Sequence, residues 1–163
     1  IDEILEAISS SQELRNVTYL NVVGGGDDLD RLKSKASNLG LGACATFWGI
    51  IDDDSLSKLY SKNDVFIMPS EKEGFGVVFL EVMRFSLPCI GGNSGGTPFV
   101  IEDNVTGFLV SRHDRKTITN AMLRLATSEE TRKLFGQAGY ERVTNTFSFE
   151  SFKSQLKSIQ DLI

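Results

Sequence analysis

The sequence has few of the residues that build metal centres or disulfide frameworks. Its 163 residues include two cysteines and one histidine, too few and too widely spaced to form a metal site. Cys44 and Cys89 both lie in apolar, strand-like runs, so we predict reduced core thiols and a cytoplasmic protein. We expect no bound metal and no cofactor.

Positive charge is also scarce. Lys and Arg number 17 against 22 Asp and Glu, which gives a net charge of -5. A nucleic-acid-binding protein would carry a basic face, so we exclude nucleic acid as a partner. Any anionic ligand would have to be held by main-chain amides and helix dipoles rather than by a basic surface.

Long apolar runs are missing as well. The sequence has no stretch of about 18 apolar residues, which a membrane-spanning helix would need. The first residues, 1–8, are acidic and helical, unlike a signal peptide. Because the chain opens directly in an amphipathic helix without an initiator methionine, we expect it to be a piece of a longer protein.

What the sequence does have is an alternation of strand-like and helix-like segments. This order is typical of an α/β fold with a Rossmann-like parallel sheet and helices on both faces. The length fits a single domain, residues 1–163. Short apolar runs predict strands at residues 17–23, 43–48, 65–68, 88–90 and 107–110.

The residues after the last predicted strand have a helical period throughout. Leu134, Ala138 and Val143 fall on one apolar stripe, and Phe149 and Phe152 belong to another. We expect both stripes to be apolar faces. The last stripe is either domain core or the docking face for a missing domain, and we favour core for Phe149 and Phe152.

The third predicted strand leads into a turn broken by glycines. Pro69 and Ser70 end the strand, and Gly74 and Gly76 precede a helical pattern. Such a turn leaves main-chain N–H groups unpaired at a helix N-terminus, where the helix dipole adds partial positive charge. The segment therefore suits a phosphate group.

Two carboxylates, Glu73 and Glu81, bracket this turn. If the intervening residues were all helical, the step would cover about 12 Å, roughly the reach needed to hold both ends of an extended phosphorylated ligand. Most glutamates are solvated surface residues, and the spacing alone favours that interpretation. The combination of buried strand, glycine turn, paired acids and a second strand closed by glycines favours a ligand site.

This combination resembles a known family. The residues that carry the resemblance are Pro69-Ser70, Glu73-Gly-Phe-Gly76, Glu81, Leu87-Pro88, Gly95-Gly96-Thr-Pro98 and Thr106-Gly-Phe-Leu109. They are similar to the signature of retaining nucleotide-sugar glycosyltransferases of glycosyltransferase family 4, which have the two-domain GT-B architecture. Glu73 and Glu81 match the paired glutamates of that signature. The match covers residues 17–110 well and the helical tail loosely.

The resemblance implies that the chain is the C-terminal, donor-binding half of such an enzyme. An N-terminal acceptor domain, the first strand of this domain, and a basic pair that contacts the pyrophosphate would then precede Ile1. We expect the 163 residues alone to bind donor weakly and to catalyse nothing.

The resemblance also implies roles for individual residues. Glu73 is the expected catalytic residue, which would hold the sugar hydroxyls against the leaving phosphate, and Glu81 would accept hydrogen bonds from the ribose. Main-chain amides would stabilise the diphosphate without a metal ion. The expected donor-binding residues are Gly25, Gly26, Ile51, Glu73, Gly74, Phe75, Gly76, Val77 and Glu81.

The glycine turn after the first predicted strand has a competing interpretation. It follows a strand and opens a helix, as a dinucleotide fingerprint would, but the third glycine of that fingerprint would fall at Leu29. By itself the motif is typical of a structural turn. The resemblance implies that the turn lies over the donor phosphates, while the main chain near Ile51 reads the edge of the base.

Three residues depart from the family pattern. The family usually has small residues where Phe85 and Ser86 stand, and an acid where Phe99 follows Pro98. Phe99 would change the sugar or acceptor side of the pocket. The identity of the donor sugar is therefore left open.

The resemblance implies a UDP-sugar donor first and GDP-mannose second, with a glycan or lipid-linked sugar as acceptor on the N-terminal domain. It also implies bacterial surface polysaccharide or O-antigen assembly, with the full-length protein peripherally associated with the inner face of the cytoplasmic membrane. The alternatives are a dinucleotide-dependent oxidoreductase, a non-catalytic sugar-nucleotide-binding domain, and a GT-B phosphorylase or epimerase.

Overall fold

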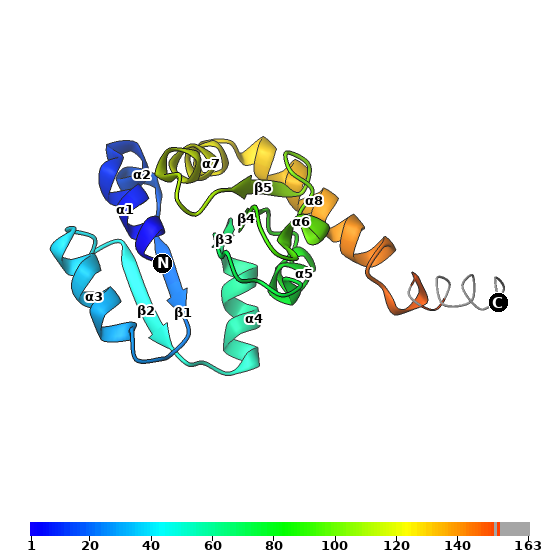
Figure 1. Ribbon diagram of the computed structural model, residues 1–163, viewed down its shortest axis with the longest axis horizontal. Helices are drawn as coiled ribbons and strands as arrows, with labels where there is room; N and C mark the ends of the chain where they lie inside the picture. The colour runs from blue at the N-terminus through cyan, green and yellow to red at the C-terminus, as the bar shows by residue number, and fades with distance from the viewer. Residues whose placement is uncertain (152, 154–163) are drawn as a thin grey trace.

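The computed structural model describes residues 1–151 and 153. Helices and strands alternate along these residues (Figure 1). The helices are α1 (Asp2–Ser10), α2 (Gln12–Val17), α3 (Leu29–Asn38), α4 (Asp53–Lys62), α5 (Val77–Met83), α6 (Thr97–Val100), α7 (Arg115–Thr127) and α8 (Glu129–Asn145). The strands are β1 (Leu20–Val23), β2 (Ala45–Gly49), β3 (Phe66–Met68), β4 (Cys89–Gly92) and β5 (Gly107–Val110).

The strands pair in parallel and form two groups. β1 pairs with β2, whereas β3, β4 and β5 pair in that order. Helices connect successive strands, as parallel pairing requires, and the predicted α/β fold with parallel strands is confirmed. The division into two groups differs from the single sheet that the alternation predicted. Figure 1 shows the β1–β2 pair to the left of the three-stranded group.

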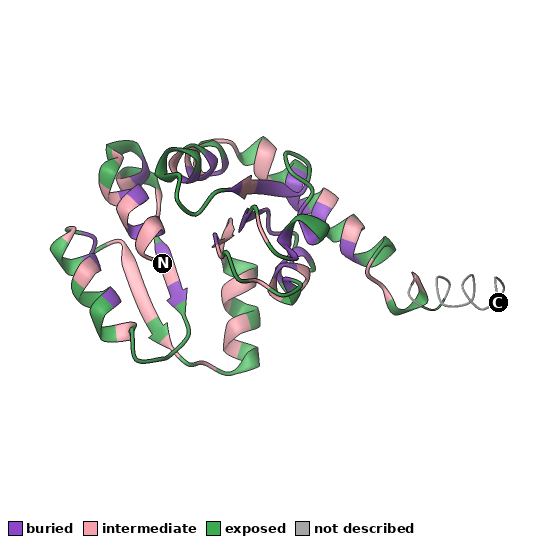
Figure 2. Ribbon diagram, viewed as in Figure 1, coloured by how far each residue is buried: buried purple, intermediate pink, exposed green. Residues whose placement is uncertain are grey.

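Two apolar clusters lie on opposite faces of β3. Ile67 packs against the larger cluster, which α1 and α7 cover, and Phe66 and Met68 pack against the smaller one beneath α5. In Figure 2 the buried residues of α1 and α7 face the strands. Ile4 and Leu5 of α1 are at most 1% exposed.

The two cysteines lie against these clusters as free thiols, as predicted. Cys89 is completely buried in the smaller cluster, and Cys44 is half-buried beside the larger one. Burial raises the pKa of the Cys89 thiol well above its usual range. Among the described residues, no helix combines the length and apolar character needed to cross a membrane.

The first predicted helix is divided into two. Ser11 has an extended main chain, and its hydroxyl accepts a hydrogen bond from the Leu14 N–H group at 3.3 Å, so it ends α1 and caps α2. Val17 belongs to α2, and the first strand begins at Leu20 rather than at residue 17.

The predictions for the helical tail are wrong at two positions. Leu134 is 65% exposed and Phe149 is 71% exposed. A Cβ on Gly136 of α8 would lie 2.0 Å from the Ser86 carbonyl oxygen, so this glycine, rather than Leu134, faces the domain. Glycine carries no apolar signal, which is why the pattern misplaced the buried side of α8. Phe152 lies outside the described residues.

Candidate functional site

The residues predicted to bind a ligand lie where strands end. Gly25 and Gly26 follow β1, Ile51 follows β2, and residues 73–77 follow β3. In open α/β sheets, ligands bind outside the carboxyl ends of the strands. Glu81 lies further along, within α5.

The turn before α5 depends on Gly76. This residue has a left-handed conformation, with φ +85° and ψ 39°, at the N-cap of the helix. A Cβ there would lie 2.9 Å from Cδ2 of Phe79, so both the dihedral angles and the space favour glycine. The helix then begins at Val77 without a side-chain cap, and among its first-turn amides the Phe79 N–H group donates to the Gly76 carbonyl oxygen at 2.9 Å.

The same turn rests against the segment that follows β4. The Gly96 N–H group donates to the Glu73 carbonyl oxygen at 3.0 Å. A Cβ on Gly95 would lie 2.3 Å from that oxygen, and a Cβ on Gly96 would lie 2.2 Å from the Gly74 carbonyl oxygen. Gly74 is exposed and Phe75 is 44% exposed. The turn therefore has one side packed against main chain and another open to solvent.

The two glutamates occupy different surroundings. Glu73 is half-buried, and its Cγ would lie 3.6 Å from a Cβ on Gly76, so its side chain stands beside the turn. Glu81 is exposed, just over one turn into α5. Because only Val77 to Glu81 is helical, the distance calculated for a continuous helix does not apply. Glu81 also lines a groove between β1 and β3.

Tyr60 of α4 is a neighbour of Glu81 that the sequence did not identify. Its ring packs against Phe85 with 5.5 Å between centroids, and edge-on against Phe66 at 6.3 Å. Partial burial raises the pKa of the Tyr60 phenol, and the negative charge of Glu81 raises it further. Tyr60 therefore offers a neutral hydroxyl near Glu81. Two different helices bring these residues together, so no local pattern marks the pair.

The glycine turn after β1 lies close to the end of β2. The Gly24 N–H group donates to the Gly49 carbonyl oxygen at 2.8 Å. A Cβ on Gly25 would lie 2.8 Å from Cγ1 of Ile50, whose side chain is 86% exposed. Gly25 therefore lies beside Ile50, the residue before Ile51.

Residues of the helical tail pack against the turn before α5. The Phe75 ring contacts the Phe147 ring edge-on, with centroids 6.0 Å apart, and the Arg142 guanidinium lies 5.5 Å from the Phe147 centroid. Arg142 also donates to the carbonyl oxygens of Phe99 at 3.0 Å and Val100 at 2.8 Å. Arg142 therefore ties α8 to α6 and, through Phe147, to the turn. The resemblance covered the tail only loosely and did not identify it.

Among residues 1–151 and 153, no group of three or more His, Cys, Asp or Glu side chains is arranged to hold a metal ion. The single histidine, His113, contacts a carboxylate: its Nε2 atom is 2.5 Å from a carboxylate oxygen of Glu71. A guanidinium nitrogen of Arg112 is 3.8 Å from the other oxygen of the same carboxylate. These contacts attach the segment after β5 to the loop that leads into the turn.

Known proteins match both the sequence and the fold. A GDP-mannose-dependent alpha-(1-6)-phosphatidylinositol monomannoside mannosyltransferase of Mycobacterium tuberculosis is 31% identical over 162 residues, which are 95% of this chain and 42% of the relative. The sucrose-phosphate synthase of Thermosynechococcus elongatus superposes with a TM-score of 0.82 at 28% identity, covering 99% of this chain and 41% of the synthase. The chain therefore spans less than half the length of these relatives.

A third match is to an isolated C-terminal domain rather than to a longer protein. The C-terminal domain of the glycosyl transferase group 1 family protein LpcC from Francisella tularensis superposes with a TM-score of 0.80 at 28% identity, covering 91% of this chain and 79% of that domain. The family model described as glycosyl transferases group 1 matches residues 1–142. The chain belongs to the glycosyl transferases group 1 family, and its fold is that of the GT-B glycosyltransferases.

Proposed function

We propose that this chain is the nucleotide-sugar-binding part of a glycosyltransferase that moves a glycosyl unit to a hydroxyl group with retention of anomeric configuration. The observation that carries the proposal is the turn at residues 74–76, which is open on one side and begins α5 without a side-chain cap. Membership of the glycosyl transferases group 1 family supports it.

The diphosphate of the donor would rest on the main-chain N–H groups of Phe75, Gly76 and Val77. Peptide N–H groups at the start of a helix carry partial positive charge and suit phosphate oxygens. When the bond between the sugar C1 atom and the diphosphate oxygen breaks, negative charge grows on the leaving diphosphate, and these groups stabilise it. This proposal requires no metal ion.

The flanking residues would hold the two sugar rings of the donor. Glu73 stands beside the turn, where its carboxylate would accept hydrogen bonds from the transferred sugar and position C1. Glu81, further along α5, would accept hydrogen bonds from the ribose hydroxyls. Gly25 and Gly26 would let the main chain approach the phosphates, and the main chain at Ile51 would contact the base.

The donor, acceptor and cellular setting belong to the proposal as well. A UDP-sugar is the first expectation and GDP-mannose the second, and the GDP-mannose dependence of the mycobacterial relative supports testing GDP-mannose alongside. The acceptor would be a glycan or lipid-linked sugar held by a further domain, with bacterial surface polysaccharide assembly at the inner membrane face as the setting. The 163 residues alone would bind donor without transferring it.

Calorimetric titration with UDP, UDP-glucose, UDP-N-acetylglucosamine and GDP-mannose tests the proposal. Removing a hydrogen bond to a charged group costs about 1.5–3 kcal/mol, so Glu81→Ala should weaken nucleotide binding at least about 10-fold. Glu73→Ala should leave the affinity for UDP unchanged and reduce the differences among sugars.

The matched control is Glu13→Ala, a change at an exposed glutamate of α2 on a different part of the chain. It should bind every donor as the parent does. Failure of the parent to bind any nucleotide at millimolar concentration, or equal losses in all three variants, would contradict the proposal. Binding of NADH in preference to the nucleotide sugars would favour the oxidoreductase alternative.

A further inference from the structure

One guanidinium group contacts two of the elements that hold the candidate turn. It belongs to Arg142 of α8, a helix that runs past α6 in Figure 1. Its Nε atom donates to the Val100 carbonyl oxygen at 2.8 Å, and a terminal nitrogen donates to the Phe99 carbonyl oxygen at 3.0 Å. The other terminal nitrogen lies 3.3 Å from a carboxylate oxygen of Glu102. Since each nitrogen already donates to an acceptor of this chain, Arg142 is placed to hold main chain rather than to bind a ligand.

The carbonyl groups that Arg142 binds lie at the end of a short helix. α6 has four residues, Thr97–Val100, and the last carbonyl groups of a helix have no partner within it. The Thr97 oxygen accepts from the Ile101 N–H group at 2.9 Å, whereas the oxygens of the last two residues accept from Arg142. A forked guanidinium can bond two such oxygens at once, which the ammonium of lysine cannot do in the same geometry. Arg142 therefore fixes the end of α6.

α6 contacts the candidate turn through its first residues. The Gly96 N–H group, at the N-cap of α6, donates to the Glu73 carbonyl oxygen at 3.0 Å. A Cβ on Gly96 would lie 2.5 Å from the Cα atom of Phe75, so the two main-chain segments touch. Because α6 is only four residues long, a shift at its end would move its start as well. The hydrogen bonds from Arg142 therefore determine where the turn lies on the side of α6.

The same guanidinium supports the turn by a second route. Its carbon atom lies 5.5 Å from the centroid of the Phe147 ring. This ring meets the Phe75 ring edge-on, with 6.0 Å between the centroids. A cation over an aromatic face and an edge-on aromatic pair are both favourable contacts. Arg142, α6, the turn and Phe147 thus form a closed ring of contacts.

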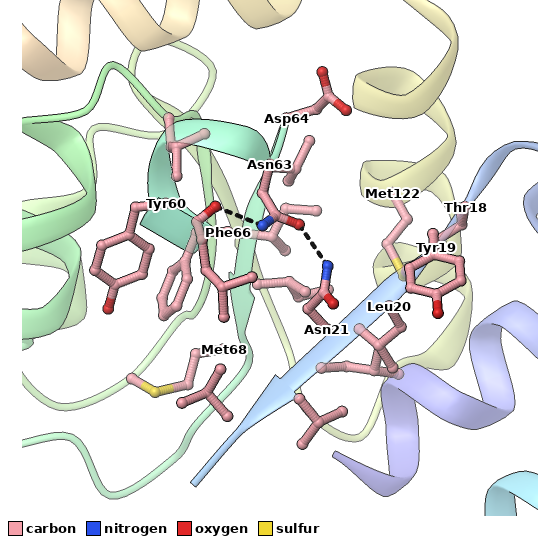
Figure 3. Close-up of a pocket in the computed structure, with 18 of the residues that line it drawn as sticks. Thr18, Tyr19, Leu20, Asn21, Tyr60, Asn63, Asp64, Phe66, Met68 and Met122 are labelled. Atoms are coloured by element: carbon pink, nitrogen blue, oxygen red, sulfur yellow. Dashed lines mark hydrogen bonds between the residues drawn. The ribbon is translucent and has the colours of Figure 1, made fainter. Parts of the chain in front are cut away.

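This ring of contacts is separate from the groove between β1 and β3. The groove has a volume of about 640 Å³, and Leu20, Asn63 and Phe66 are among the residues that line it (Figure 3). Of the described residues, those that line the groove include neither Phe75 nor Arg142. An amide beside the groove therefore serves as an internal reference, because a change at Arg142 should alter the turn without altering the groove.

We propose that Arg142 is a positioning residue for nucleotide binding, which acts through α6 and Phe147 to hold the turn with the N–H groups of residues 75–77 presented together. The inference rests on the proposed function, in which these N–H groups receive the diphosphate. Main chain that is already ordered does not have to be fixed when a ligand binds, so its support raises affinity. Loss of the support should weaken nucleotide binding although Arg142 itself does not contact the nucleotide.

Four variants of the chain test the proposal. Arg142→Lys keeps the charge but loses the fork, and Phe147→Leu keeps an apolar side chain but loses the ring. Phe147→Tyr keeps the ring and is the conservative variant. The control is Arg124→Lys, because the Arg124 guanidinium of α7 also lies over a phenyl ring, that of Phe108 in β5, at 4.7 Å. Main-chain hydrogen exchange is measured without nucleotide, and UDP binding is measured by calorimetric titration well below the melting temperature of each variant.

Without nucleotide, Arg142→Lys and Phe147→Leu should speed the exchange of two amides at least about tenfold. These are the amides of Gly96 and Phe79, which donate to carbonyl oxygens of the turn at 3.0 and 2.9 Å. The Leu20 amide, which donates to a β2-side oxygen at 2.8 Å, should exchange as in the parent. UDP affinity should fall about tenfold in the same two variants. Phe147→Tyr and the control should stay within about twofold of the parent.

A spectroscopic signature separates positioning from a purely structural contact. In the parent, the Nε–H signal of Arg142 should shift when UDP binds, while that of Arg124 should not. Unchanged exchange at Gly96 and Phe79 in the two variants would overturn the proposal. So would faster exchange with the parent's UDP affinity, or an equal loss of affinity in the control. If exchange quickens but the parent binds no nucleotide, the proposed function fails while the hold of Arg142 on the turn is upheld.

Discussion

At the scale of single residues, the candidate turn is defined by how closely main-chain segments approach one another. A Cβ on Gly96 would lie 2.2 Å from the Gly74 carbonyl oxygen, a separation that no side chain permits. Gly76 adds a left-handed conformation that L-residues rarely adopt. The shape of the turn therefore depends on the absence of a side chain at Gly76 and Gly96.

Gly76→Ala should destabilise the protein by about 1–2 kcal/mol, because alanine is strained in the left-handed region and its Cβ would press on Phe79. It should also weaken nucleotide binding, because the turn would have to shift. Urea unfolding and titration with UDP measure the two effects.

Gly74→Ala is the matched control for stability. Gly74 has no strained φ, and a Cβ there would meet no atom within 4 Å. The free energy of unfolding of the Gly74→Ala variant should differ from that of the parent by less than about 0.5 kcal/mol. If both substitutions destabilise equally, the conformation at Gly76 does not hold the turn.

The sequence analysis singled out the glycines of the turn, Glu73 and Glu81 because they lie close together in the sequence and follow a recognisable strand. It did not predict Tyr60 near Glu81, or Arg142 bonded to the carbonyl oxygens of α6. Both depend on contacts between elements distant in sequence, and their local patterns are those of ordinary helix residues.

At the scale of elements, charged side chains join α1 to α3 and α7. Arg31 donates both to Asp2 and to Asp28, and Lys35 donates to Asp2 at 2.7 Å and to Glu6 at 2.6 Å. Arg115 of α7 also contacts the Glu6 carboxylate. Asp28 is the N-cap residue of α3, but its carboxylate forms no cap hydrogen bond and binds Arg31 instead.

These ion pairs predict a pH dependence of stability. Hydrogen bonds from Arg31 hold the pKa of Asp2 well below its ordinary value of 3.8. A depressed pKa stabilises the folded state above the ordinary value, and the stabilisation is lost as the pH falls below it. Asp2→Asn should therefore cost about 1 kcal/mol or less at pH 6, and the difference from the parent should shrink below about pH 4.

Urea unfolding between pH 3 and pH 7 measures this difference. Asp30→Asn is the control, because the Asp30 side chain is 95% exposed and lies 3.7 Å from its partner Lys33. It should differ from the parent by a few tenths of a kcal/mol at most. A difference for Asp2→Asn that stays constant to pH 3 would contradict the assignment.

Element boundaries were predicted where side chains determine them. The strand at residues 107–110 was predicted at its observed bounds. The division of the first helix at Ser11 was not, because it depends on an extended main chain within the polar residues 9–13, which carry no apolar signal. The buried side of α8 was also misplaced, since the residue that meets the Ser86 carbonyl oxygen is Gly136.

At the scale of the whole molecule, the alternation of segments predicted parallel strands and helices on both faces, but not the division into two groups. Strand neighbours are set by contacts between distant residues, and the local pattern of a strand is the same whether one or both of its edges are paired. The groove between β1 and β3 therefore appears only in the structure.

The central claim is that a nucleotide diphosphate rests on the turn that begins α5. Titration of the isotope-labelled chain with UDP, followed through its main-chain amide resonances, tests it most directly. The amide signals of Phe75, Gly76 and Val77 should shift together with that of Gly25, while the signal of Ser34, on α3, should not move. Saturation without a shift at the turn, or shifts confined to Asn21 and Ile67 in the groove, would contradict it.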